Sequence, residues 1–131
     1  MLKIGNRETL LSYAESPSSR RAREIALDTV ENVLTAIDPK RIIKSKVVLN
    51  EDHLHVNGHS FDLNSFHRIL VIGGGKASGS MAEGLEEILG DRIEEGLVVV
   101  PRGTEDRYKT RRIGVQGASH PIPDSRSVET A

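Results

Sequence analysis

Apolar residues between positions 22 and 37 recur at spacings of three and four, which places them on one face of a helix. These residues are Ala22, Ile25, Ala26, Val30, Val33, Leu34 and Ile37. The pattern predicts a helix that begins at about Ser18 and ends at Asp38-Pro39, because the residue before a proline avoids the helical region. Residues 1–17 show little pattern, and we expect them to be loosely ordered.

The next segment has the pattern of short strands, the first at residues 46–49. Two further short stretches flank Asn57-Gly58, a dipeptide typical of a type I′ turn, and predict a small β-hairpin. Four of the five histidines lie in or near this hairpin, at positions 53, 55, 59 and 67. Because no carboxylate or cysteine completes a ligand set with them, we expect solvent-facing polar positions and no metal site.

A strand–helix–strand pattern follows the hairpin. Residues 68–72 form a continuous apolar run, which is typical of a strand buried on both faces. The helical stripe after it ends at Gly90 and consists of Met81, Leu85, Ile88 and Leu89. Residues 96–100 and 112–116 predict two more strands. The spacing suits a right-handed parallel crossover, so we expect an α/β fold with a mainly parallel sheet and a small β-hairpin.

The first of these parallel strands runs into Gly73-Gly74-Gly75-Lys76. Glycine lets the main chain approach a ligand closely, and the free N–H groups at a helix start favour an anion. Lys76 is poorly placed for the helix itself, because its charge meets the positive end of the helix dipole. A bound anion would offset that cost, and a phosphate is the first candidate.

Two common phosphate-binding motifs do not fit this turn. A Walker A loop requires G-x-x-x-x-G-K-[ST], but Leu70 stands at its first glycine and Ala77 at its hydroxyl position. Gly73 and Gly75 fit the dinucleotide fingerprint G-x-G-x-x-G, but Ser78 replaces the third glycine. The turn is therefore a candidate anion site that belongs to neither class.

Ligands of parallel sheets bind beyond the carboxyl ends of the strands. This rule places residues 73–78, 101–103 and 118–124 on one rim. The last range contains the corner His120-Pro121-Ile122-Pro123-Asp124, which is stiff because its prolines fix φ. Asp124 can cap a following helix, and we expect the corner to aim His120 at the rim, in a substrate-binding or structural role.

Composition narrows the functional class. The 131 residues carry a net charge of −1, two tyrosines, two phenylalanines and no tryptophan, which gives no general attraction to nucleic acid and no platform for stacking bases. The absence of cysteine excludes disulfides and thiolate metal sites and favours the cytoplasm. No apolar run approaches membrane-spanning length, so we expect a cytoplasmic protein with no membrane partner.

Taken in order, these features resemble the N-terminal part of the class II glycerate kinases, the glycerate 2-kinase or MOFRL-type proteins. The resemblance covers the chain from about Ser18 onward and rests chiefly on Gly73-Gly74-Gly75-Lys76-Ala77 and the corner at residues 120–124. It implies a Rossmann-like three-layer sandwich, of which residues 1–131 are an incomplete N-terminal part. The C-terminal remainder, with the metal ligands, would be missing.

The resemblance also implies an activity. The full-length protein would be a kinase of carbohydrate metabolism that phosphorylates D-glycerate with ATP and magnesium and yields 2-phosphoglycerate. The active site would lie in a cleft between a larger and a smaller domain, and a homo-oligomer is compatible with this architecture. We expect the isolated 131 residues to be inactive.

The family's motifs map onto specific residues of this chain. Lys76 is implied to be catalytic, and substrate or phosphate would be bound by Gly73, Gly74, Gly75, Ala77, Ser78, His120 and Asp124. Two positions depart from the usual motifs: Gly74 stands where the family more often has alanine, and Ser119 stands where it more often has glycine. No metal ligand and no general base is assigned in this segment.

Two alternatives stay open at this point. One is an NAD(P)-dependent hydroxypyruvate or 2-hydroxyacid oxidoreductase, which Gly73-x-Gly75 and an older label of the family favour. The other is a non-catalytic anion-binding module of the same fold. Titration with NAD(P)H distinguishes the first alternative from a kinase, and an assay of ATP turnover distinguishes the second.

Overall fold

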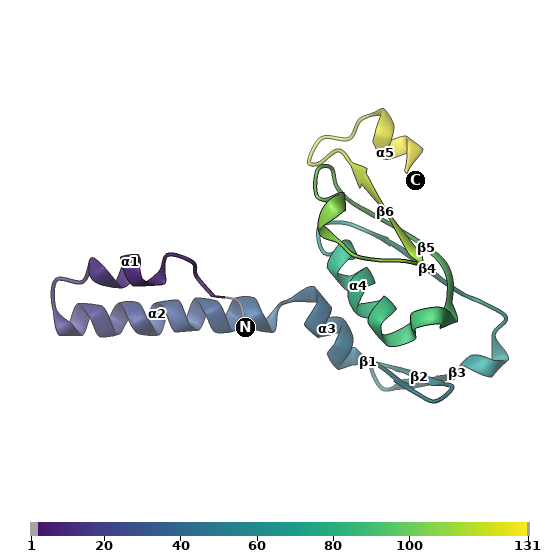
Figure 1. Ribbon diagram of the computed structural model, residues 1–131, viewed down its shortest axis with the longest axis horizontal. Helices are drawn as coiled ribbons and strands as arrows, with labels where there is room; N and C mark the ends of the chain where they lie inside the picture. The colour runs from purple at the N-terminus through teal and green to yellow at the C-terminus, as the bar shows by residue number, and fades with distance from the viewer. Residues whose placement is uncertain (1–2, 131) are drawn as a thin grey trace. The chain divides into compact units, whose positions relative to one another are not determined.

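The computed structural model of the chain describes residues 3–130. The chain divides into two compact units, Met1–Asp38 and Pro39–Ala131. Figure 1 labels the helices and strands of both units. Among the described residues, no helix is long and apolar enough to span a bilayer.

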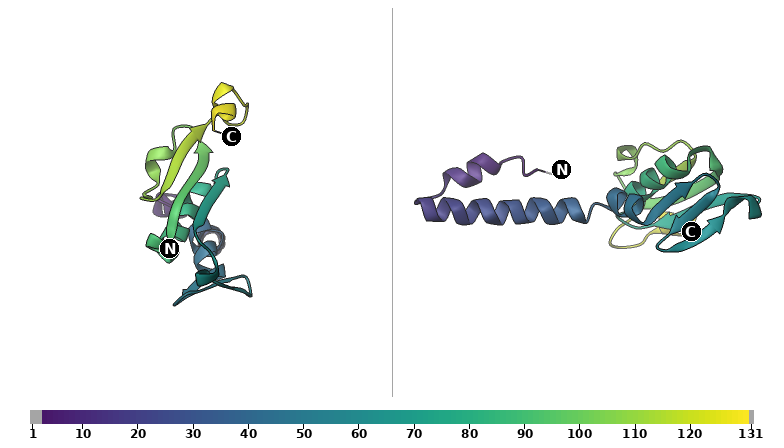
Figure 2. Two further views of the ribbon diagram at one scale, coloured as in Figure 1. Left: turned by 90° about the vertical axis from the view of Figure 1, so that its right-hand side faces the viewer. Right: turned by 90° about the horizontal axis from the view of Figure 1, so that it is seen from below.

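The first unit is a pair of helices, seen side by side in the right-hand view of Figure 2. Helix α2 (Pro17–Ala36) confirms the helix that the apolar periodicity predicts. Pro17 has a fixed φ that suits the first turn, and Ser16 caps the helix by accepting a hydrogen bond from the Ser19 N–H at 3.1 Å. The helix ends just before Asp38-Pro39, as expected.

The sequence pattern does not predict helix α1 (Arg7–Ser12), so the expectation of loose order is wrong for this stretch. Polar contacts hold the helix in place. The Arg7 guanidinium donates to Asp28 Oδ1 at 2.7 Å and to Glu31 Oε2 at 3.3 Å. The partners are separated by 21 and 24 positions in the sequence, so local sequence patterns do not reveal these bonds.

The side of α2 that is buried in this unit is a polar one. Glu31 and Thr35 are each only 8% exposed. The predicted apolar stripe lies on the opposite side of the helix, and its large members are exposed: Ile25, Val30, Val33, Leu34 and Ile37. The amphipathic pattern therefore identifies the helix but not the face that is buried within this unit.

The second unit begins with helix α3 (Pro39–Lys46), which the sequence pattern does not predict. Pro39 both ends α2 and suits the first turn of α3. An antiparallel sheet follows, of β1 (Val47–Asn50), β2 (His53–Val56) and β3 (His59–Asp62). The hairpin prediction is confirmed, because Asn57 and Gly58 have φ values of 47° and 90° and a type I′ turn needs positive φ at both positions.

The main sheet is parallel and has the order β4-β5-β6. Its strands are β4 (Ile69–Gly74), β5 (Ile93–Pro101) and β6 (Ile113–Ala118). Helix α4 (Ser78–Leu89) connects β4 to β5 and ends at Gly90, whose φ of 52° fits the expected glycine stop. The remaining elements are helix α5 (Ser125–Glu129) and three 3₁₀ turns, Leu63–Ser65, Gly90–Arg92 and Glu105–Arg107. The predicted strand–helix–strand unit and third strand are confirmed.

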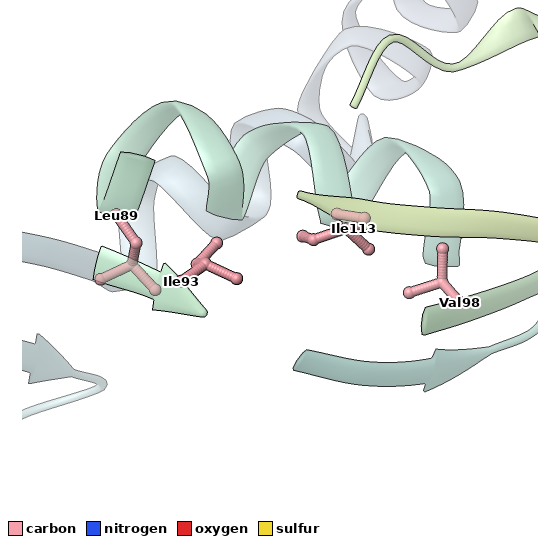
Figure 3. Packing of buried hydrophobic residues seen from close by; sticks show 5 residues of the cluster. Leu89, Ile93, Val98 and Ile113 are labelled. Atoms are coloured by element: carbon pink, nitrogen blue, oxygen red, sulfur yellow. The ribbon is translucent and has the colours of Figure 1, made fainter. Parts of the chain in front are cut away.

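Helix α4 covers one face of this sheet, and the core lies at their contact (Figure 3). The buried residues of this cluster are Ala82, Leu89, Ile93, Val98 and Ile113. On the opposite face, Leu70, Ile72 and Leu97 are 47%, 87% and 37% exposed, so β4 is not buried on both faces as expected. The α/β class and the parallel sheet are confirmed. Within the described part of this unit the sheet has a helix on one face only, and a third, Rossmann-like layer remains a prediction.

Strand β4 lies at the edge of the parallel sheet, paired on one side only within the described residues. Its sequence, Ile69-Leu70-Val71-Ile72-Gly73-Gly74, contains no charged residue and no proline. Edge strands of natural proteins usually carry charged residues or proline, which discourage pairing with other chains. This edge lacks that protection.

Two glutamates of α4 hold the connection that leads to β6. Glu83 Oε1 accepts a hydrogen bond from the Lys109 N–H at 2.8 Å. Glu86 Oε1 accepts hydrogen bonds from the N–H groups of Arg111 and Arg112 at 2.8 and 3.1 Å. Glu86 is buried, so water does not compete strongly for these bonds. They fix the start of the strand whose far end carries the proline corner.

Helix α3 packs closely on α4 because Gly84 has no side chain. A Cβ at this position would lie 3.2 Å from the Lys40 carbonyl oxygen and 3.4 Å from the Ile43 side chain. Lys40 and Lys44 of α3 also form ion pairs with Glu87 of α4. Hydrogen bonds from Lys40 and then Lys44 lower the pKa of Glu87 below its ordinary value.

We expect Glu87→Gln to destabilise the protein near neutral pH and to have no effect in strong acid. A lowered folded-state pKa means that the ion pairs contribute stability above the ordinary glutamate pKa and lose it as the pH falls through the lowered value. The effect is small, because the Glu87 side chain is 45% exposed and solvent screens the pairs. Urea unfolding at about pH 7 and about pH 2 measures it.

The control is Glu94→Gln, which removes an exposed carboxylate of β5 away from the α3–α4 contact. A loss of stability in Glu87→Gln that is equally large at both pH values contradicts the ion-pair explanation. The same loss in the control variant also contradicts it.

Candidate functional site

The turn after β4 is built on Gly75. Its φ of 114° lies in the region that favours glycine. Its N–H donates to the Val99 carbonyl oxygen of β5 at 2.9 Å. The chain then enters α4 through Lys76 and Ala77. The pairing of β4 with β5 therefore determines where this turn lies.

Ser78, the first residue of α4, closes the turn. Its N–H donates to the Gly75 carbonyl oxygen at 3.1 Å, and its hydroxyl lies 2.7 Å from the same oxygen and 2.8 Å from the Val99 carbonyl oxygen. Ser78 is 7% exposed. The resemblance to the glycerate kinases implies that Ser78 binds substrate or phosphate; in the structure its hydroxyl donates to the main chain.

The N–H groups of Lys76 and Ala77 donate no hydrogen bond within residues 3–130. They lie at the N-terminal end of α4, where the helix dipole favours an anion. The Lys76 side chain is exposed. The turn therefore holds two main-chain donors without a partner among residues 3–130, beside an exposed positive charge.

A cavity of about 170 Å³ lies between this turn and the proline corner. Gly75 and Lys76 line it from the turn, and Ser119 and His120 line it from the corner. The other lining residues come from the ends of β5 and β6: Val99, Val100, Pro101 and Ala118. The structure thus brings Lys76 and His120 to one cavity at the carboxyl ends of parallel strands, where the rim rule predicts a ligand.

Asp124 is placed at the start of α5 and does not line this cavity. The Ser119 hydroxyl donates to Asp124 Oδ2 at 2.5 Å, across the corner. The Asp124 carbonyl oxygen accepts a hydrogen bond from the Ser127 N–H at 3.0 Å. The His120-Pro121 peptide bond between these groups is cis. The predicted helix after Asp124 is confirmed, and the geometry gives Asp124 a role in shaping the corner.

A second cavity, of about 550 Å³, shares Gly75 and Lys76 with the first. Its other turn residues are Gly73, Gly74, Ala77 and Ser78. Apolar side chains form the rest of the lining: Ile43, Val71, Ile72, Met81, Ala82, Leu85 and Val98. Sequence reasoning misses Ile43, because it belongs to a helix that the pattern does not predict. The amphipathic spacing within residues 39–46 is the signal that could have identified it.

Residues 25–131 match the family described as "Domain of unknown function (DUF4147)". The chain belongs to this family. It is 37% identical over 106 residues to the glycerate 2-kinase of Pyrococcus horikoshii, covering 81% of this chain and 23% of that protein. It is 31% identical over 128 residues to the glycerate kinase of Danio rerio, covering 88% of this chain and 24% of that protein. The chain thus spans about a quarter of the length of these relatives.

A solved structure supports the same relationship for this DUF4147 chain. The crystal structure of a Pyrococcus horikoshii protein is similar with a TM-score of 0.71 and 35% sequence identity, over 84% of this chain and 24% of that one. The resemblance to the glycerate kinases, which the glycine-lysine turn and the proline corner indicate, is therefore confirmed.

The structure shows the surroundings of the two positions at which we expect this DUF4147 chain to depart from the family's motifs. At Gly74, no heavy atom lies within 4 Å of where a Cβ would be, so the space suits glycine and alanine alike. At position 119, the serine hydroxyl donates a hydrogen bond to Asp124 across the corner. An alanine at position 74 would meet open space, and the serine at position 119 makes a hydrogen bond that glycine cannot make.

The geometry differs from that of a dinucleotide-binding turn. The third glycine of that fingerprint allows close helix–strand packing. Here Ser78 occupies the position, and its hydroxyl bonds to β5. Gly79 comes one residue later and is needed for packing, because a Cβ there would lie 2.5 Å from the Tyr108 ring. The Gly73-x-Gly75 match therefore does not extend to the rest of the fingerprint.

Within residues 3–130, no group of three or more His, Asp or Glu side chains is arranged to hold a metal ion. The histidines of the hairpin lie on β2 and β3. Strand register places His53, His55 and His59 opposite Asp62, Ser60 and Val56 rather than opposite one another.

We expect Gly75→Ala to destabilise the protein by about 1–3 kcal/mol, because alanine must adopt a positive φ there. Gly74→Ala is the matched control, since its Cβ meets open space. Urea unfolding measures both free energies. Equal losses in the two variants would show that the backbone of Gly75 is not special.

Proposed function

We propose that a protein carrying this chain is a glycerate kinase that transfers the γ-phosphoryl group of ATP to D-glycerate. The observation that carries the proposal is the presence of Lys76 and His120 at one cavity in a chain of the DUF4147 family. A relative named glycerate 2-kinase supports 2-phosphoglycerate as the product.

Lys76 is the residue that we assign to charge neutralisation. Phosphoryl transfer depends on positioning and on stabilising negative charge more than on covalent chemistry. The Lys76 ammonium is a point charge on a flexible stem, which suits the transferred phosphoryl group or the glycerate carboxylate. The free N–H groups of Lys76 and Ala77 can bind an oxygen of a second anionic group.

His120 lies at the same cavity and has an exposed imidazole. We assign it to positioning the substrate, because an imidazole can donate to or accept from a glycerate hydroxyl. The hydrogen bond between Ser119 and Asp124 supports this role, since it braces the corner on which His120 stands. No general base is assigned to the described residues.

ATP and magnesium place different demands on this segment. The phosphates of ATP fit the N–H donors and the ammonium of the turn. Magnesium takes oxygen ligands, and residues 3–130 contain no group of carboxylates arranged to hold a metal ion. As the resemblance implies, we assign the magnesium ligands to the part of the relatives' length that this chain does not span. Bound with ATP, the ion would neutralise phosphate charge.

Glycerate-dependent consumption of ATP tests the proposal, in a polypeptide that carries this chain at the length of its relatives. Phosphorus NMR of the product distinguishes 2-phosphoglycerate from 3-phosphoglycerate. Binding of NAD(P)H with reduction of hydroxypyruvate and no ATP turnover would replace the kinase with an oxidoreductase. Phosphate binding without either reaction would leave an anion-binding module.

We expect Lys76→Ala to lower the turnover number of that polypeptide by about 10²–10³, because one preorganised electrostatic contact to the transition state is lost. The fold should be unaffected, since the Lys76 side chain is exposed. Lys109→Ala is the control, because it removes another exposed lysine whose main-chain bond to Glu83 remains. Near-normal turnover in Lys76→Ala would remove the catalytic assignment.

We also expect the 131 residues alone to show no glycerate-dependent ATP turnover. The chain supplies the turn and the corner, while about three quarters of the relatives' length lies outside it. The same coupled assay, at equal molar concentration of the short and long polypeptides, checks this. Turnover by the short chain would mean that the whole active site is contained in it.

A further inference from the structure

The hydroxyl of Ser78 is enclosed at the junction of β4, α4 and β5. It lies 2.7 Å from the Gly75 carbonyl oxygen and 2.8 Å from the Val99 carbonyl oxygen. Ser78 is 7% exposed, so solvent has little access to it. A hydroxyl has one proton to donate, and here two main-chain oxygens share it. To donate to an anionic ligand, the hydroxyl would have to give up its bonds to these two oxygens.

We propose that Ser78 is a positioning residue, which holds the turn so that the N–H groups of Lys76 and Ala77 face an anion. This inference rests on the proposed function, because the turn needs a fixed geometry only if it binds an anion. Three consecutive glycines precede Lys76 and allow the main chain many conformations. Gly73 and Gly74 are held in β4 by pairing with β5, so the remaining freedom is that of Gly75. The Ser78 hydroxyl restricts it by tying the Gly75 peptide to the central strand.

The other hydrogen bonds of the turn determine how the structure responds when the Ser78 hydroxyl is removed. The Gly75 carbonyl oxygen also accepts from the Ser78 N–H at 3.1 Å, and the Val99 carbonyl oxygen also accepts from the Gly75 N–H at 2.9 Å. Neither oxygen is left without a donor in Ser78→Ala, so the fold should survive. The turn then has two bonds where it had four contacts, and its geometry loosens.

The experiment uses the 131-residue chain and inorganic phosphate as the probe. Amide hydrogen exchange at Gly75 reports the bond to Val99, and NMR titration of the Lys76 and Ala77 amide signals reports phosphate binding. The variants are Ser78→Ala, Ser78→Thr, which keeps the hydroxyl, and the control Ser80→Ala. Ser80 is also on α4, and its side chain makes no hydrogen bond within the described part of the chain.

In Ser78→Ala we expect exchange at Gly75 to become about fivefold faster, the effect of losing a hydrogen bond of ordinary strength. Phosphate affinity should fall several-fold in the same variant, while the melting temperature stays close to that of Ser80→Ala. Ser78→Thr should restore both exchange and affinity.

Two results would overturn the proposal. Weaker phosphate binding with unchanged exchange at Gly75 would make Ser78 a ligand, and unchanged values of both would make its hydroxyl irrelevant to the turn. If the unmodified chain binds no phosphate, the anion site of the proposed function fails. The exchange rate at Gly75 then decides the role of Ser78 by itself.

Discussion

The carbonyl oxygen of Val99 is the acceptor on which the geometry of the site depends. It receives the Gly75 N–H at 2.9 Å and lies 2.8 Å from the Ser78 hydroxyl. Val99 belongs to β5, the strand between β4 and β6, and its register partner on β6 is Gln116. The turn that carries Lys76 bonds to the central strand β5, and the strand β6 that leads to His120 pairs with it. Their mutual placement follows from ordinary sheet pairing.

The polar groups of the glycine-lysine turn and the proline corner fall into two sets with different tasks. The hydroxyls of Ser78 and Ser119 are used inside the framework, one toward main-chain carbonyls and the other toward Asp124. The second set is the exposed Lys76 and His120 side chains, together with the N–H groups of Lys76 and Ala77, which donate no hydrogen bond within residues 3–130. Because such a set consists almost wholly of donors, we expect it to favour an oxyanion over a neutral polar group.

Local rules of sequence account for most of the second unit. Asn57-Gly58 requires positive φ at both positions, Gly90 ends a helix, and the apolar run at residues 68–72 leads into a glycine-rich turn. Each of these features depends on the residues themselves and their immediate neighbours. The rim rule then places Lys76 and the proline corner together, because parallel strands have their carboxyl ends on one side.

The features that sequence does not predict depend on distant partners. Helix α1 is held by bonds from Arg7 to Asp28 and Glu31, which periodicity does not register. The direction of the Ser78 hydroxyl depends on an acceptor 21 positions away. An apolar run such as that of β4 does not distinguish a strand covered on one face of the sheet from a strand covered on both.

Strand β4 also has a consequence for how this chain behaves in a test tube. It combines an uncharged, proline-free edge with Ile72 standing 87% exposed on the open face of the sheet. Any extended apolar segment, including the same segment of a neighbouring unfolded molecule, can add to such an edge through main-chain hydrogen bonds. That reaction is bimolecular, whereas folding is unimolecular. We therefore expect the yield of monomer on refolding to rise as the chain is diluted.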